Sequence, residues 1–171
     1  MTEPKPDSGF EEVVKAYAGD LYRYAFWLAR DRQLAEDVIQ EALLRGWRGF
    51  AGLRDRAAAK GWLFSIVRNE FRRVIAKNAP YADAIDVAEV EVADEHGALL
   101  GLEMRDALRA LPAPYADPLA LQVLGGFSCA EIAAMLETSE GAVMTRLTRA
   151  RQSLKRLIAP GAASERRGGR S

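Results

Sequence analysis

The chain has 171 residues, of which 49% are hydrophobic, and its formal net charge is zero; this length allows one ordinary domain or two small ones. A single cysteine, Cys129, excludes an internal disulfide, and a single histidine, His96, leaves no plausible His/Cys metal cluster, so we expect no metal and no cofactor. No apolar run approaches the ~20 residues of a membrane helix, and residues 1–9 lack a signal peptide. We therefore expect a cytoplasmic protein with no membrane contact of its own.

Helical periodicity dominates the sequence, and we predict an all-α fold. An apolar stripe at 3.6-residue spacing predicts a first helix, through Phe10, Val13, Val14, Tyr17, Leu21, Tyr24, Ala25 and Leu28. Asp31 is a candidate N-cap for a second helix. The inward stripe of that helix consists of Ala35, Val38, Ile39, Ala42 and Gly46. Its opposite face carries Asp37, Gln40, Glu41, Leu44 and Arg48.

A glycine-marked break predicts a loop or short turn at residues 50–60, followed by a third helix from about residue 61 to residue 77. The expected core of this helix is Leu63, Val67, Phe71, Val74 and Ile75. Its other face carries Ser65, Arg68, Asn69, Arg72 and Arg73. Such basic side chains can hold a phosphate backbone, and the nearby aromatic residues Phe50, Trp62 and Phe64 can stack on unpaired bases. Tryptophans at helical spacing are more often core residues, which remains the alternative for Trp47 and Trp62.

Residues 80–98 are acidic and weakly periodic, and we predict that they form a flexible linker. A second helical unit then begins near residue 99, with a helix closed by Pro112 and Pro114. The next helix is expected to have Pro118 in its first turn and to end at Gly125 and Gly126. Residues 160–171 are rich in Gly, Ala and Arg and are predicted to be disordered.

The spacing of Ser128 and Glu131 predicts a capping box at the start of a short helix. A turn at residues 137–139 separates it from a longer helix with a buried stripe of Val143, Leu147, Ala150, Leu154 and Leu157. These are the proportions of a helix-turn-helix, whose second helix lies in the major groove of DNA. Its outward face suits base recognition and carries Ala142, Thr145, Arg146, Arg149, Gln152 and Arg156. An ordinary amphipathic helix pair with a basic exposed side is the alternative.

Charge is strongly segregated along the chain. Nine basic residues lie between Arg45 and Lys77 against two acids, and eight lie between residues 141 and 171 against one acid. Between them, seven acids and no Lys or Arg lie from Asp83 to Glu103. Two separated basic surfaces favour two contacts with a polyanion, although solvated helix faces would give the same pattern.

Three stretches together resemble one protein family. They are Leu34-Ala-Glu-Asp-Val-Ile-Gln-Glu41 continuing to Trp47, Gly61-Trp-Leu-Phe-Ser-Ile-Val-Arg-Asn69, and Phe127-Ser-Cys-Ala-Glu-Ile-Ala-Ala134 with Gly141-Ala-Val143 and Arg146-Leu-Thr-Arg-Ala-Arg151. Over roughly residues 10–158 the chain is similar to the extracytoplasmic-function (group IV) sigma factors of bacterial RNA polymerase. This resemblance implies a region 2 domain at residues 8–79, the linker at 80–98, a region 4 domain at 99–159 and a tail at 160–171.

The resemblance also implies roles for single residues. Region 2 would grip the clamp coiled coil of the polymerase largest subunit through Asp37, Gln40, Glu41, Leu44 and Trp47. It would recognise and melt the minus-ten element through Phe50, Arg68, Asn69, Arg72 and Arg73. The loop at residues 50–60 would capture a flipped-out base together with Asn69. Region 4 would read the minus-thirty-five element through Ser139, Thr145, Arg146, Thr148, Arg149 and Arg151.

The partners implied by the resemblance are core RNA polymerase (clamp coiled coil and flap), promoter DNA and an anti-sigma factor. The linker would run through the nucleic-acid channel of the polymerase, and the chain itself would catalyse no reaction. Two positions depart from the family pattern. Met144 stands where a basic residue is common, and Glu137 stands where the turn often has glycine, so a left-handed conformation costs more there.

Two other classes of protein fit parts of the sequence. A conventional helix-turn-helix regulator, acting without polymerase docking, would use the first unit to sense a signal or to dimerise. A helical enzyme would use the paired carboxylates of Glu36 and Asp37. We disfavour the enzyme because adjacent residues on a helix point apart, and because the Glu-x-x-His motif of di-iron bundles is absent.

Overall fold

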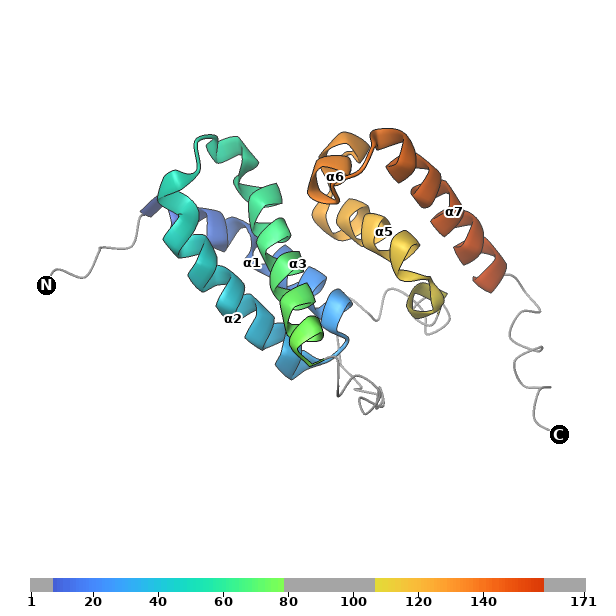
Figure 1. The fold of residues 1–171 in the computed structure, drawn as a ribbon, viewed down its shortest axis with the longest axis horizontal. Helices are drawn as coiled ribbons and strands as arrows, with labels where there is room; N and C mark the ends of the chain where they lie inside the picture. The colour runs from blue at the N-terminus through green and yellow to red at the C-terminus, as the bar shows by residue number, and fades with distance from the viewer. Residues whose placement is uncertain (1–7, 79–106, 159–171) are drawn as a thin grey trace, which may run out of the picture. The chain divides into compact units, whose positions relative to one another are not determined.

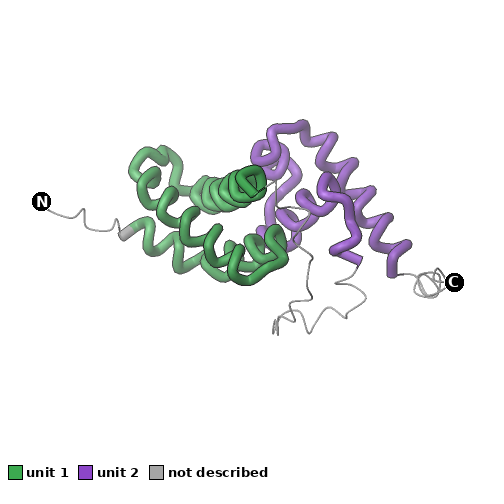
Figure 2. The backbone as a smooth tube through the Cα atoms, turned by 60° about the horizontal axis from the view of Figure 1, so that its bottom comes forward, with its two compact units in different colours: residues 1–91 green, residues 92–171 purple. Residues whose placement is uncertain are grey.

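The computed structural model describes residues 8–78 and 107–158, which form helices joined by short turns (Figure 1). The chain divides into two compact units, Met1–Glu91 and Val92–Ser171, which Figure 2 shows in different colours. The prediction of an all-α chain with two helical units is confirmed. The predicted linker at residues 80–98, most of the helix predicted after residue 99 and the predicted tail at residues 160–171 lie outside the described residues.

The first unit contains three long helices, α1 (Ser8–Ala29), α2 (Arg32–Gly49) and α3 (Ala59–Lys77), each of which packs against the other two. Apolar side chains from all three helices form its core, among them Phe10, Leu21, Tyr24, Ala35, Val38, Leu63 and Val67. Gly46 lies where α2 packs tightly against side chains of its neighbours. A Cβ atom on this residue would lie 3.0 Å from Leu63 Cδ2 and 3.3 Å from the Phe10 ring. Only glycine therefore fits at this crossing without a shift of the packed side chains.

The junction of α1 and α2 follows the predicted cap. Asp31 precedes α2 with an extended backbone, and its Oδ1 accepts a hydrogen bond from the Leu34 N–H at 2.8 Å. Arg30, one residue earlier, has a left-handed backbone with φ of 53°. The reversal of the chain thus takes place immediately before a capped helix start, where the side-chain oxygen satisfies an otherwise unpaired N–H.

The segment predicted as a loop contains two short 3₁₀ helices, η1 (Phe50–Gly52) and η2 (Arg56–Ala58). Asp55 caps η2, because its side chain accepts a hydrogen bond from the Ala57 N–H at 2.9 Å. Helix α3 then begins at Ala59, two residues before the predicted start.

Two predictions for α3 were wrong, one for a core residue and one for an aromatic residue expected to stack on bases. Ile75 is 39% exposed, because it lies roughly 80° around the helix from Val67, at the edge of the buried stripe. Phe64, which we had grouped with aromatic residues that could stack on bases, is fully buried, with its ring 5.2 Å from that of Tyr24. Helix α3 contacts both α1 and α2, so its buried stripe is wide enough to include the neighbours Leu63 and Phe64.

The second unit is described from residue 107 and contains α5 (Ala113–Gly125), α6 (Cys129–Met135) and α7 (Glu140–Ile158), in which α7 packs against both other helices. Helix α5 begins earlier than predicted, with Pro112 as its N-cap and Pro114 in its first turn. Pro118 lies inside the helix and is buried, so its predicted place in the first turn was wrong. Gly126 ends α5 with φ of 68°, as its position in the sequence predicted.

Candidate nucleic-acid and protein interfaces

One side of α2 carries all five residues predicted to grip a partner protein, which we call the α2 face: Asp37, Gln40, Glu41, Leu44 and Trp47. The other side of the helix supplies buried residues to the core. Leu44 is 48% exposed and Trp47 is 38% exposed, although both are large and apolar. An exposed apolar pair three residues apart, bordered by acid and amide groups, has the composition of a protein-binding patch.

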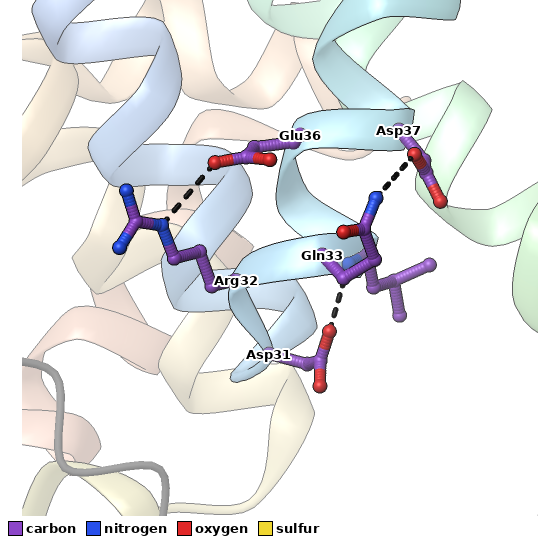
Figure 3. A network of polar contacts seen from close by, with 6 residues as sticks. Asp31, Arg32, Gln33, Glu36 and Asp37 are labelled. Atoms are coloured by element: carbon purple, nitrogen blue, oxygen red, sulfur yellow. Dashed lines mark hydrogen bonds and ion pairs between the residues drawn. The ribbon is translucent and has the colours of Figure 1, made fainter.

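The two adjacent carboxylates near the start of α2 have separate partners. Figure 3 shows Arg32 bonded to Glu36, with 3.2 Å between Nε and Oε1, and Gln33 donating to Asp37 Oδ1 at 3.0 Å. Glu36 and Asp37 therefore do not form the carboxylate pair that a helical hydrolase or oxidase would need. Gln33 instead holds the exposed Asp37 carboxylate at the edge of the α2 face.

A buried acid of α3 is linked to the α2 face through an arginine. Glu70 of α3 is 4% exposed, and within the described ranges it is the one charged residue in the core. Its Oε2 lies 2.5 Å from Arg45 Nε, and its Oε1 lies 3.5 Å from Arg73 Nη1. Arg45 Nε also lies 3.5 Å from Glu41 Oε1, on the α2 face. This chain of ion pairs connects the α2 face to α3.

The basic side of α3 carries the residues predicted at the minus-ten DNA. Asn69, Arg72 and Arg73 are exposed, and Arg68 is half-buried. Asn69 and Arg73 also border a hollow of about 290 Å³, which is lined further by Arg45, Ile66 and Glu70. This surface joins exposed guanidinium groups, which suit phosphates, to an amide that can pair with a base edge.

Phe50, predicted with this set, lies elsewhere. Its side chain is 1% exposed, and its ring centroid lies 5.3 Å from that of Phe10 and 6.3 Å from that of Trp62. The Arg56 guanidinium covers the ring at 3.9 Å. A base cannot stack on this ring without displacing those neighbours, so Phe50 supports the segment from residue 50 to residue 60 from within the core.

Helices α6 and α7 form the predicted helix-turn-helix. The capping box is complete, because Ser128 Oγ accepts from the Glu131 N–H at 3.2 Å and Glu131 Oε2 accepts from the Ser128 N–H at 2.7 Å. Glu137, in the turn, has φ of 53°. The predicted left-handed turn is therefore present on a residue that adopts it less readily than glycine.

The predicted minus-thirty-five residues lie on or at the start of α7. Thr145, Thr148, Arg149 and Arg151 are exposed, and Arg146 is half-buried. Both threonine hydroxyls donate to carbonyls of their own helix, Thr145 to Gly141 at 3.0 Å and Thr148 to Met144 at 2.9 Å.

Two members of this set have contacts within the protein. Ser139 Oγ accepts from the Ala142 N–H at 3.1 Å and therefore caps the first turn of α7. Arg151 Nη2 donates to Gln122 Oε1 of α5, which ties the two helices together. The serine cap could have been found in the sequence, because a serine immediately precedes the predicted helix. No local pattern pointed to the partner of Arg151 or to the burial of Glu70.

None of the helices in the described ranges combines the length and apolar character that crossing a membrane requires. Residues 8–78 and 107–158 also contain no group of three His, Cys, Asp or Glu side chains that could hold a metal ion.

Comparison with known families identifies two matched segments. Residues 13–80 match the model of Sigma-70 region 2, and residues 101–154 match that of Sigma-70 region 4. Among curated proteins, the chain is 35% identical over 150 residues to the ECF RNA polymerase sigma factor SigL of Mycobacterium tuberculosis, covering 81% of this chain and 82% of that protein. It is 27% identical to SigM of Bacillus subtilis, covering 91% and 98% of the two chains.

A solved structure with the same fold is the sigma factor RpoE of Bartonella quintana, determined in complex with the anti-sigma factor NepR. The TM-score is 0.76 at 26% identity, and the match covers 89% of this chain and 98% of that one. The match therefore spans both helical units of this chain within one protein, RpoE.

Proposed function

The chain belongs to the extracytoplasmic-function group of bacterial RNA polymerase sigma factors, and from this premise we propose how its residues divide the work of transcription initiation. As a sigma factor it binds core RNA polymerase and directs it to promoters. The alternative of a conventional helix-turn-helix regulator does not account for the region 2 match over residues 13–80. The chain would work in the cytoplasm and leave catalysis to the polymerase.

The α2 face is our proposed polymerase-binding surface, and the exposure of Leu44 and Trp47 is the observation that carries this assignment. Two large apolar side chains on one helix are costly to leave in water, and they resemble the aromatic and aliphatic anchors of protein interfaces. Asp37 and Glu41 border them with negative charge. The proposed occupant is the clamp coiled coil of the polymerase largest subunit, which would complement that charge with basic groups.

We assign the basic side of α3 to the minus-ten element. Arg68, Arg72 and Arg73 would hold the phosphate backbone, and Asn69 would contact an unstacked base. Base unstacking costs a few kcal/mol for each nucleotide, which phosphate neutralisation and base capture would offset together with polymerase contacts. Phe50 takes a supporting role in this scheme because its ring is buried.

The minus-thirty-five element is assigned to α7, lying in the major groove as the second helix of a helix-turn-helix. Arg146 and Arg149 would donate to base edges or phosphates, and Thr145 and Thr148 would present their methyl groups. Ser139 fixes the start of the helix. The hydrogen bond of Arg151 to Gln122 favours an orienting role for Arg151 over base contact.

Run-off transcription tests this scheme. Core polymerase is mixed with the wild-type chain, Trp47→Ala or Leu44→Ser on a genomic promoter library, and core binding is measured in parallel. We expect specific transcripts from the wild type and at least tenfold weaker core binding by either variant. Ile75→Ser is the matched control for core binding, because Ile75 is 39% exposed against 38% for Trp47 and lies on α3, outside the α2 face. Equal core binding by all four proteins would refute the α2 assignment.

An anti-sigma factor that covers the α2 face is part of the same proposal. The similar RpoE was solved with an anti-sigma factor. In this chain, the exposed apolar pair Leu44 and Trp47 is a ready site for an inhibitor that competes with polymerase. Purification of the tagged chain from unstressed cells should recover a stoichiometric partner that core polymerase displaces. Recovery of polymerase subunits alone would count against it.

A further inference from the structure

Met144 is an exposed apolar side chain on the helix assigned to DNA. It is 56% exposed, whereas its neighbours Val143 and Leu147 are 0% and 1% exposed and belong to the core. Met144 lies in the second turn of α7, which begins at Glu140. In a helix-turn-helix this end of the second helix meets the base edges. The exposed thioether chain therefore has no part in the core of its unit, yet it lies where base contacts are made.

The surroundings of Met144 on α7 offer few hydrogen-bond donors. Thr145 and Thr148 use their hydroxyl protons on the carbonyls of Gly141 and Met144. Gly141 has no side chain, and a Cβ atom there would meet nothing within 4 Å. The first turns of the helix thus present a methionine and threonine methyl groups beside an open backbone. The arginines assigned to DNA follow along the helix, at the half-buried Arg146 and the exposed Arg149.

Among the groups exposed in the major groove, the 5-methyl of thymine is the apolar one, and side chains recognise it by apolar contact. We propose that Met144 is a specificity-determining residue that packs on a thymine methyl group in the minus-thirty-five element, with the Thr148 methyl beside it. This inference rests on the proposed function of α7. It adds a preference for thymine that the arginines alone, which favour guanine, do not give.

Deoxyuridine provides the test, because it lacks the 5-methyl group and keeps every hydrogen-bonding group of thymine. Holoenzyme is assembled from core polymerase and the wild-type chain, and its affinity is measured for promoter duplexes from the library selection, each with one minus-thirty-five thymine on either strand replaced by deoxyuridine. Burying one methyl group contributes about 0.8 kcal/mol. We therefore expect about fourfold weaker binding at one position.

The same substitution is then combined with protein variants. Met144→Ala should bind the thymine promoter more weakly and show no further loss with deoxyuridine at that position. Met144→Gln, which keeps the chain length and removes the apolar end, should behave in the same way. Val123→Ala is the matched control on α5, since Val123 is 70% exposed in the same unit. This variant should keep the fourfold loss of affinity caused by deoxyuridine.

The outcomes separate the two proposals. Wild-type holoenzyme that binds no minus-thirty-five sequence would refute the proposed function itself. Specific binding that is indifferent to deoxyuridine at every position, or an element without thymine, would overturn the role of Met144 alone. An undiminished deoxyuridine step in both Met144 variants would also overturn it. Weaker binding of Met144→Ala to core polymerase without DNA, with no deoxyuridine effect in the wild type, would place Met144 in a protein contact.

Discussion

Arg45 on α2 and Glu70 on α3 form an ion pair between packed helices, with 2.5 Å between Nε and Oε2. The two partners differ in exposure, because the Glu70 side chain is 4% exposed and that of Arg45 is 39% exposed. A carboxylate that is almost removed from water needs a charged partner, and here one cation comes from the neighbouring helix and another, Arg73, from its own helix. Glu70 therefore connects the proposed polymerase face to the proposed minus-ten face.

Replacement of Glu70 by Ala should lower the free energy of unfolding of the first unit by about 1–3 kcal/mol. The loss is expected to be smaller than for a fully buried pair, because Arg45 keeps Glu41 and water as partners. Urea unfolding followed by tryptophan fluorescence measures it, since Trp27, Trp47 and Trp62, the three tryptophans of the chain, all lie in the first unit.

The double variant Arg45→Met with Glu70→Leu is the control for this prediction. Replacing both charges by apolar side chains should recover part of the loss, because no buried charge is left unpaired. Glu70→Ala with an unchanged urea midpoint would mean that the ion pair contributes nothing to stability.

The short helix α6 should depend on its capping box. Ser128→Ala removes the acceptor for the Glu131 N–H and should cost about 1 kcal/mol. Amide hydrogen exchange measured by NMR should then be about fivefold faster in α6 than in the wild type. Glu131→Gln is the control, because glutamine also completes a capping box. Unchanged exchange in Ser128→Ala would contradict the prediction, whereas faster exchange in Glu131→Gln would mean that the negative charge of Glu131 also stabilises the start of α6.

Opposite changes in stability are expected at the two left-handed turns of the second unit. Glu137→Gly removes the strain of a side chain at φ of 53° and should stabilise by about 0.5–1 kcal/mol after the entropy of glycine is counted. Gly126→Ala introduces such strain at φ of 68° and should destabilise by about 1–2 kcal/mol. Thermal unfolding by circular dichroism measures both. Shifts of the same sign would contradict the assigned turn conformations.

The two basic faces should differ in what they contribute to promoter binding. Arg72→Ala should weaken holoenzyme binding uniformly across promoter sequences and reduce the slope of log affinity against log salt by about 1. Arg149→Ala should cost about 1–3 kcal/mol and relax preference at one base position. Affinities across a potassium chloride series and a base-substitution series separate the two effects.

Lys15 on α1 provides the control for that experiment, because it is exposed and lies outside both basic faces. Lys15→Ala should leave the salt slope and the base preferences unchanged. If Lys15→Ala lowered the salt slope as much as Arg72→Ala does, net charge rather than the position of the charge would govern binding.

The helix caps and turns could be predicted from the amino-acid sequence. The Asp31 cap, the capping box of Ser128 and Glu131, the stop at Gly126 and the strained turn at Glu137 were all predicted and are present. Each depends on residues within a few positions of one another, because caps and turns satisfy backbone groups of the same chain segment. The apolar periodicity likewise indicated which side of each long helix is buried.

Other features depended on packing between distant segments. The ring of Phe50 is buried beside those of Phe10 and Trp62, and the partner of Arg151 is Gln122. Periodicity could not assign these contacts, because it gives the direction in which a side chain points and not what it meets there. Glu70 shows the difference most clearly. The sequence by itself determined the helices, several of their caps and their charged faces. Only the tertiary structure decided which charge is buried, because burial of a carboxylate depends on a cation that another helix brings to it.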